Sequence, residues 1–196
     1  MSRYLLTQSL ISSWLYIYKA YDDFKEQAYE DFVITLNRQP KEQTPAMLDG
    51  INFENMINAV VDGLDSKNKN INEISSIVCG GQKQVALRKD KHISGIDFLL
   101  YGKLDYLKAG TIYDIKFSKK YEVGKFFDSI QHPFYMELCS EARYFEYLVS
   151  NGNDVFVERY DRREIDRIDT TVTEFIQFLY DCKLHKTYFE KWESFK

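Results

Sequence analysis

Hydrophobic residues in the first 80 positions recur at the spacing of helices. Thr44 followed by Pro45 is typical of an N-cap and a first helical turn. The pattern predicts helices over roughly 6–21, 24–36, 45–64 and 71–78. We therefore expect a helical N-terminal part over residues 1–80.

The middle of the chain changes to alternating, β-branched and aromatic residues, which favour strands. Three neighbouring strands are predicted in "QVALRK" (84–89), "ISGIDFLLYGKLDYL" (93–107) and "TIYDIKF" (111–117). Helical periodicity returns over about 129–149, "DVFVERY" (154–160) predicts a last strand, and a C-terminal helix is expected over 164–190. This order predicts an α/β fold in which a small mixed β-sheet is flanked by helices.

Composition limits the classes of protein that fit. The chain has 196 residues, of which 44% are hydrophobic and 16% aromatic, enough for one well-buried core and a single domain over 1–196. A formal net charge of -4 argues against a protein that coats nucleic acid through a globally basic surface, and leaves room for a local basic groove.

The cysteines and the apolar segments exclude two further classes. Cys79, Cys139 and Cys182 lie far apart with no CxxC pair, so the spacing indicates neither a disulfide framework nor a zinc or iron–sulfur site. No segment approaches the length of about 18 uninterrupted apolar residues that a membrane span requires. We therefore expect a cytoplasmic protein without a membrane partner.

Two acidic residues in the β-rich region need an explanation, because burying an unpaired charge is costly. If Ala109 and Gly110 form a two-residue hairpin loop, the residue numbers of two cross-strand partners always add up to 219. Asp105 then lies opposite Asp114. Their Cβ atoms would be about 4.5–5.5 Å apart, a separation that favours a cation between the carboxylates. A three-residue loop would make this pairing diagonal.

Side-chain alternation then sorts the hairpin residues onto two faces. Lys116 falls on the face of Asp114. The residues expected on the opposite face, toward the core, are Leu104, Tyr106, Tyr113, Ile115 and Phe117.

The Asp-x-Lys triplet is informative only in context. It begins at Asp23, Asp65, Asp114 and Asp181, and three of these copies fall in helical or loop stretches. Only the copy at Asp114 lies in a predicted strand, after "GKLD" (102–105) and before "QHPFY" (131–135).

The ordered set "GINFE" (50–54), "GKLD", "YDIK" (113–116) and "SIQHPFY" (129–135) resembles the PD-(D/E)XK nuclease superfamily, in particular its RecB-like and phage exonuclease branch. The resemblance spans about 50–160 and implies a restriction-endonuclease-like catalytic core there. The N-terminal "LTQSLISSWLYIYK" is similar to the opening helix of that branch. The chain departs from the pattern in its short connection between Asp105 and Asp114, and it lacks the cysteines that hold an iron–sulfur cluster in some relatives.

The resemblance implies roles for individual residues. Glu54, Asp105 and Asp114 would bind Mg²⁺ or Mn²⁺, and Lys116 would help to activate water. Gln131 and Tyr135 correspond to a motif that lines the site and helps to position DNA. No iron–sulfur cluster is expected. The implied function is a divalent-metal-dependent deoxyribonuclease, an exonuclease of bacterial or phage DNA recombination, repair or defence.

The residue types suit this chemistry independently of the family. Phosphodiester hydrolysis needs charge neutralised on a phosphate oxygen and a hydroxide formed near neutral pH, and carboxylate oxygens are the ligands that Mg²⁺ prefers. A lysine held near a metal ion should have its charged form disfavoured, which would help it to take part in proton transfer.

Alternatives remain at each position. Asp105, Asp114 and Lys116 also fit the polar face of an ordinary hairpin, Glu54 fits a solvated helix residue, and the spacing of Gln131 and Tyr135 also suits packing. Basic segments at 116–125, which include Lys119 and Lys120, and at 159–167 are candidates for a DNA groove or for solvated faces.

Three functions therefore compete. Besides the nuclease, the chain could be a catalytically inactive DNA- or protein-binding module with the same fold, or a structural protein without a nucleic-acid role. DNA is the expected partner, and a second copy of the chain or a recombination protein is left open.

Overall fold

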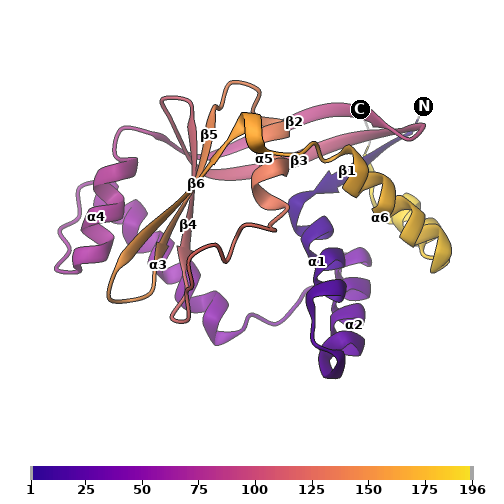
Figure 1. Ribbon diagram of the computed structural model, residues 1–196, viewed down its shortest axis with the longest axis horizontal. Coiled ribbons are helices and arrows are strands. Elements are labelled where there is room, and N and C mark those ends of the chain that lie inside the picture. The colour runs from indigo at the N-terminus through magenta and orange to yellow at the C-terminus, as the bar shows by residue number, and fades with distance from the viewer. Residues whose placement is uncertain (1, 195–196) are drawn as a thin grey trace.

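The computed structural model describes residues 2–194, which form one mixed sheet with helices on both sides (Figure 1). The strands are β1 (Arg3–Thr7), β2 (Gln82–Ile93), β3 (Ile96–Lys108), β4 (Thr111–Phe117), β5 (Tyr144–Ser150), β6 (Val155–Asp161) and β7 (Glu193–Ser194). The helices are α1 (Gln8–Lys19), α2 (Lys25–Leu36), α3 (Pro45–Val61), α4 (Lys69–Val78), α5 (Gln131–Leu138), α6 (Asp169–Asp181) and α7 (His185–Lys191), with short 3-10 turns η1 (Asp22–Phe24) and η2 (Arg162–Glu164). The predicted α/β class, with a mixed sheet flanked by helices, is confirmed.

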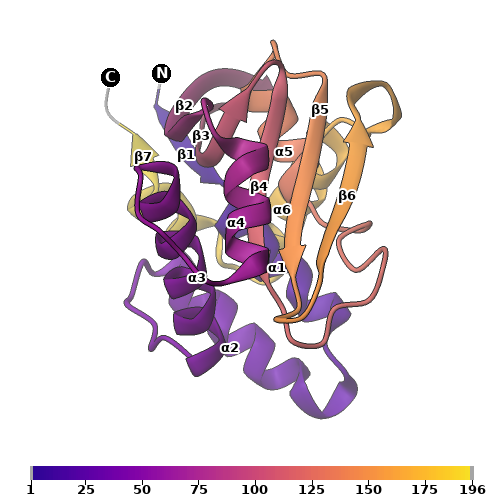
Figure 2. The ribbon, with the colours of Figure 1, turned by 90° about the vertical axis from the view of Figure 1, so that its left-hand side faces the viewer.

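Helices cover the sheet in two groups. Figure 2 shows α3 and α4 in front of the sheet, with α1, α5 and α6 behind it. The larger hydrophobic cluster joins α1, α2, α5 and α6 to one sheet face, while the smaller cluster joins α3 and α4 to the other face near β4 and β5. Within the described residues, no helix is both long enough and apolar enough to cross a membrane.

Strand β3 is the centre of the sheet. It pairs with β2 along nearly its whole length on one side. On its other side it pairs first with β1, at Phe98 to Tyr101, and then with β4, at Tyr106 to Lys108. The sheet is therefore open beside β3 between these two partners, at positions 102–105.

The predicted hairpin register is confirmed. Ala109 and Gly110 form the two-residue turn with φ angles of 49° and 78°, as such turns require. Tyr106 pairs with Tyr113, so partner numbers sum to 219. The ladder ends at this pair, however, and Asp105 and Asp114 are not strand partners.

Side-chain alternation is interrupted where the ladder ends. Leu104 packs in the larger cluster and Tyr106 in the smaller one, so the prediction that both face the same side was wrong for Leu104. The alternation is interrupted at Asp105. The register of β2 with β3 omits the pair of Asp105 and Gln84, and Gln84 has a φ of 56°. A non-glycine residue with positive φ marks a local distortion of the strand, which reorients the side chains on either side of it.

The predicted helices α1 to α4 are present, and Thr44 caps α3 as expected by accepting a hydrogen bond from the Met47 N–H (3.2 Å). The prediction that residues 1–80 are entirely helical was wrong, because Arg3–Thr7 form β1. This strand is too short to show a period in the sequence, and its parallel partner β3 lies far along the chain.

Two further predicted boundaries were wrong. The expected helix over 129–149 ends at Leu138, and Tyr144–Ser150 form the buried strand β5. Short apolar runs do not distinguish a buried strand from a buried helix. The expected helix over 164–190 is divided into α6 and α7, with Lys183 between them at a φ of 59°.

Candidate active site

Asp114 lies in the middle of β4 and is almost completely buried, with 4% of its surface exposed. Its Oδ1 accepts a hydrogen bond from Gln131 Nε2 (2.5 Å). Its Oδ2 lies 2.7 Å from Lys116 Nζ as an ion pair, but no group donates a well-aligned hydrogen bond to this buried oxygen within the described residues. Burial raises the pKa of Asp114, against the opposing effects of Lys116 and Gln131.

Asp105 occupies the opening in the sheet. Its Oδ2 accepts a hydrogen bond from the backbone N–H of Ile115 (2.8 Å). In a continuous ladder, a backbone carbonyl of the neighbouring strand would accept this hydrogen bond. Burial raises the pKa of Asp105 well above its usual range, and the charges of Asp114 and Glu54 raise it further. The Ile115 hydrogen bond and Lys116 act in the opposite direction without overcoming this. The two aspartates are therefore close enough to repel each other.

Lys116 is the cation of this cluster. Burial alone would lower its pKa, but the charges of Asp114, Asp105 and Glu54 outweigh that effect and raise the pKa. The protein without a metal ion therefore holds this lysine in its charged form, whereas a neighbouring metal ion was expected to disfavour that form.

Glu54 reaches the same region from α3. Its charge acts on Asp105 and Lys116, but its Oε1 accepts a hydrogen bond from Gln84 Nε2 (2.7 Å). Across residues 2–194, no three acidic, histidine or cysteine side chains converge closely enough to form a metal-binding group. The structure thus gathers Asp105, Asp114 and Lys116, with Glu54 nearby and turned toward Gln84.

The chemistry of this cluster fits a hard divalent cation. Asp114 is a buried carboxylate, and its Oδ2 is paired with the Lys116 ammonium at 2.7 Å. Burial raises the pKa of Asp105, and the charges of Asp114 and Glu54 raise it further, so the charged form of Asp105 is unfavourable without another cation. A divalent cation held by Asp105 and Asp114 would stabilise the charged form of both carboxylates, and carboxylate oxygens suit Mg²⁺ and Mn²⁺.

Helix α5 places two further predicted residues at the cluster. Gln131, at its first position, contacts Asp114, and the ring of Tyr135 lies against Gly102 in β3. A Cβ at Gly102 would be 2.5 Å from Tyr135 Cε1, so only glycine allows this approach. Burial raises the pKa of Tyr135, and the charges of Asp114 and Asp105 add to this effect.

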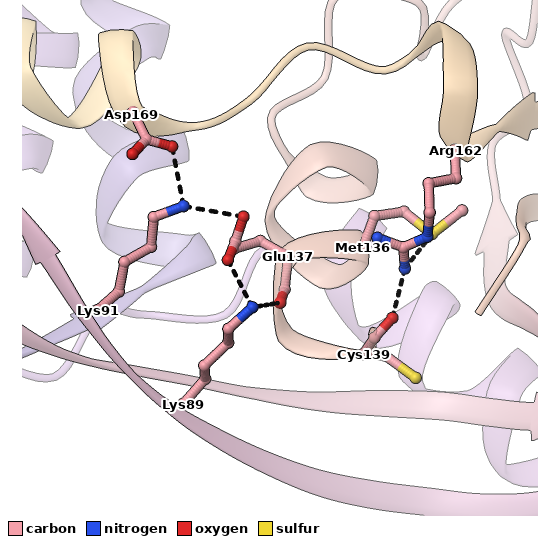
Figure 3. A network of polar contacts seen from close by, with 7 residues as sticks. All are labelled: Lys89, Lys91, Met136, Glu137, Cys139, Arg162 and Asp169. Carbon is pink, nitrogen blue, oxygen red and sulfur yellow. Dashed lines mark hydrogen bonds and ion pairs between the residues drawn. The ribbon is translucent and has the colours of Figure 1, made fainter. Parts of the chain in front are cut away.

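A polar network holds α5 against β2 (Figure 3). Glu137 forms ion pairs with Lys89 (2.6 Å) and Lys91 (2.9 Å), both from β2. Lys91 also reaches Asp169, at the start of α6 (2.8 Å). At the other end of the network in Figure 3, Arg162 donates to the carbonyl oxygen of Cys139, which follows α5. These contacts connect the helix that carries Gln131 to the rest of the fold.

The basic loop after β4 is held by a buried carboxylate. Glu158, in β6, accepts hydrogen bonds from the hydroxyls of Tyr121 and Tyr160 and from the Gly124 N–H (3.0 Å). Lys119 pairs with Asp49 of α3 (2.8 Å), and Lys120 is exposed. Neither lysine contacts the aspartate cluster through a hydrogen bond or ion pair.

A cavity of about 490 Å³ lies between this loop and the start of α3. Lys116, Lys119 and Lys125 line it together with Phe117 and Phe126. Lys116 therefore borders both the aspartate cluster and an open space beside it.

Sequence reasoning missed several residues that shape this region. Gln84 holds Glu54, Glu137 anchors α5 and Glu158 anchors the basic loop. Gln84 lies 30 residues from Glu54 along the chain, and Glu158 lies 34 residues from Gly124. No local sequence pattern could therefore reveal these contacts.

Comparison with known proteins gives a fold. No family model and no curated protein matches the chain. Among solved structures, that of SSO0001 has a TM-score of 0.58 at 12% identity, over 93% of this chain and 83% of that one. The structure of LHK-Exo in complex with dAMP covers 95% of this chain and 87% of its own at 15% identity, but its TM-score of 0.42 is too low to support an argument. The chain therefore shares its fold with SSO0001, and its function has to be argued from its own residues.

Proposed function

We propose that this protein is a divalent-metal-dependent DNA nuclease that hydrolyses phosphodiester bonds. The observation that carries the proposal is the gathering of the buried Asp114 carboxylate, its ion pair with Lys116 (2.7 Å) and the nearby Asp105, whose pKa is raised. The order of the motifs, which resembles that of the RecB-like and phage exonucleases, favours an exonuclease.

The acidic residues would bind the metal ion, and Gln131 would orient one of them. Asp114 and Asp105 would hold Mg²⁺ or Mn²⁺, and Glu54 would join them after leaving Gln84. The bound cation would neutralise charge on the phosphate and lower the pKa of a water molecule. Gln131 orients the Asp114 carboxylate through its hydrogen bond.

Lys116 contributes in a different way. Its ammonium has no acceptor and cannot bind a metal ion. From its place beside Asp114 it can donate to the attacking water or to the phosphate, which stabilises the negative charge that develops in the transition state. The adjacent cavity offers space for the DNA backbone next to this group.

A second candidate is an inactive module that binds DNA or protein through the same fold. The hydrogen bond between Glu54 and Gln84 favours it, as does the lack of a converged three-ligand group among residues 2–194. In this case the aspartate cluster would be a structural remnant of the fold.

Digestion of labelled DNA distinguishes the nuclease from the inactive binding module. Linear and covalently closed circular duplexes are incubated with the protein in Mg²⁺, in Mn²⁺ and in EDTA, with Asp114→Asn purified in parallel to exclude a contaminating nuclease. The nuclease is supported if parent protein with metal degrades linear DNA and the variant does not, and an exonuclease is supported if circular DNA survives. If no divalent metal supports cleavage by the parent, the inactive module is the better description.

A further inference from the structure

Gln84 connects β2 to α3 beside the candidate active site. Its Nε2 donates a hydrogen bond to Glu54 Oε1 (2.7 Å), and both side chains are half-buried. A hydrogen bond to a carboxylate is stronger than one between neutral groups, and partial burial reduces the competition from water. A neutral amide thus holds Glu54, although Glu54 is one of the three carboxylates expected to bind the metal ion.

The backbone of Gln84 adopts an unusual conformation for a residue within a strand. Its φ of 56° lies in the left-handed region, which a glutamine disfavours. The register of β2 with β3 omits the pair of Gln84 and Asp105, while the pairs on both sides of it are kept. Strained residues of this kind concentrate at functional sites, where the surrounding structure holds them. The distortion is therefore confined to the residue that lies opposite Asp105 and contacts Glu54.

Two other contacts fix α3 against the sheet. The Tyr106 hydroxyl donates a hydrogen bond to Asn58 Oδ1 (2.5 Å), one helical turn after Glu54. Lys83 pairs with Asp62, which follows α3 (2.5 Å). Because neither contact involves Glu54, the helix would stay in place if Glu54 lost its present partner. Only the side chain of Glu54 would have to turn for its carboxylate to approach the aspartates.

The charges of the cluster explain why Glu54 is held aside. The carboxylates of Glu54, Asp105 and Asp114 act together on a single ammonium, so negative charge is in excess. The charge of Glu54 already raises the pKa of Asp105 at their present separation, and a closer approach would strengthen this repulsion. A divalent cation would reverse the balance, because it attracts every carboxylate near it. Contact with the Gln84 amide thus suits the protein without the ion.

We propose that Gln84 is a positioning residue, which keeps Glu54 away from the two aspartates until a divalent cation binds. The inference rests on the proposed function for the identity of the metal site. It accounts for the lack of a converged three-ligand group among residues 2–194. Binding of the ion through Glu54 requires the hydrogen bond to Gln84 to break, so this contact lowers the apparent affinity for the ion.

Calorimetry with Mn²⁺ tests this competition without any cleavage. Gln84→Gly removes the amide and retains the backbone conformation, because glycine adopts a φ of 56° without strain. Mn²⁺ should bind this variant about 3–10-fold more tightly than the parent, the effect of losing one competing hydrogen bond. Gln84→Asn should act in the same direction, because asparagine tolerates a positive φ but is shorter by one methylene group. A purely structural contact predicts unchanged or weaker binding.

Two controls assign the effect to Glu54. Gln82→Gly changes an exposed glutamine of the same strand and should bind Mn²⁺ as the parent does. In a Glu54→Gln background, Gln84→Gly should no longer raise the affinity, because the charged ligand is already absent. Thermal unfolding without metal checks that each variant is folded. Unchanged or weaker Mn²⁺ binding by Gln84→Gly, or an equal gain in the Glu54→Gln background, overturns the proposal.

The outcomes distinguish this role from the proposed function. If the parent digests DNA with Mn²⁺ but Gln84→Gly gains no affinity, the positioning role fails and the nuclease proposal stands. If Gln84→Gly gains affinity through Glu54 but neither protein digests DNA, the positioning role stands and the nuclease proposal fails. If neither protein binds Mn²⁺, both proposals fail.

Discussion

Gln131 Nε2 lies 2.5 Å from Asp114 Oδ1, and this contact joins the first position of α5 to the middle of β4. Gln131→Leu removes the donor that orients the Asp114 carboxylate and stabilises its charged form. We expect both Mn²⁺ affinity and DNA cleavage to fall about 10–100-fold, the usual effect of losing such a supporting contact.

Gln177→Leu is the matched control for this change. Gln177 also donates to an aspartate, Asp181 (2.8 Å), but on the exposed surface of α6. Calorimetry with Mn²⁺ and a cleavage time course should show parent-like values for the control. A Gln131→Leu variant with unchanged affinity and rate would show that the contact is only structural.

Lys116 and Asp114 should respond differently to substitution. Asp114→Asn removes the charge of a metal-binding oxygen, so Mn²⁺ binding and cleavage should both fall. Lys116→Ala should leave Mn²⁺ binding nearly intact and reduce cleavage about 10²–10⁴-fold, because the ammonium acts on the water or the transition state. The same two assays measure both effects. Undiminished cleavage by Lys116→Ala would falsify the catalytic role of the lysine.

Gly102 should tolerate no side chain while Tyr135 occupies its present position. A Cβ there would be 2.5 Å from Tyr135 Cε1, so Gly102→Ala should lower the free energy of unfolding by about 1–3 kcal/mol. Gly50→Ala is the control, because nothing lies within 4 Å of its Cβ position in α3 and alanine favours the helix by roughly 0.5–1 kcal/mol. Urea unfolding measures both. Adding Tyr135→Leu to Gly102→Ala should recover part of the loss if the clash is its cause.

Glu158 should control the order of the basic loop. Glu158→Gln replaces the carboxylate that receives hydrogen bonds from Tyr121, Tyr160 and Gly124. We expect trypsin to cleave at Lys119, Lys120 or Lys125 several times faster in this variant, as local opening becomes easier. Glu122→Gln, an exposed acid in the same loop, should be cut at the parent rate. Equal cleavage rates for parent and Glu158→Gln would contradict the anchoring role.

His132 should make stability depend on pH. Burial lowers its pKa from 6.5 to about 4, although Glu158 acts in the opposite direction. Its ring stacks on Tyr160 at 4.1 Å, and its Nδ1 lies 3.3 Å from the Tyr147 hydroxyl. Because the unfolded chain binds the proton more tightly, this contribution to stability is present above about pH 6.5 and is lost as the pH falls toward about 4.

The free energy of unfolding in urea, measured at several pH values, tests this expectation. His132→Gln should flatten the part of the curve between about pH 6.5 and 4. An identical slope in parent and His132→Gln would assign the acid sensitivity to other groups.

Local sequence determined the elements whose signals lie within a few residues. Thr44 and Pro45 define the start of α3, and Ala109 with Gly110 defines the turn of the β3–β4 hairpin and its register. Both are decided by backbone geometry and by hydrogen bonds between near neighbours. The same register placed Asp114 and Lys116 on one face, and the structure has them 2.7 Å apart.

Only the tertiary structure decided which groups the carboxylates of Asp105 and Glu54 contact. The hairpin ladder stops at Tyr106, and Asp105 bonds the Ile115 N–H because β1 takes the place of β4 beside the first half of β3. Tyr144–Ser150 became a strand, despite a helical pattern, because parallel pairing with β4 satisfies its backbone in the buried centre of the sheet. Gln84 likewise meets Glu54 only after α3 packs against the sheet. These contacts join residues distant in the chain, and their free energy comes from burial and pairing across the fold, which no local pattern of residues encodes.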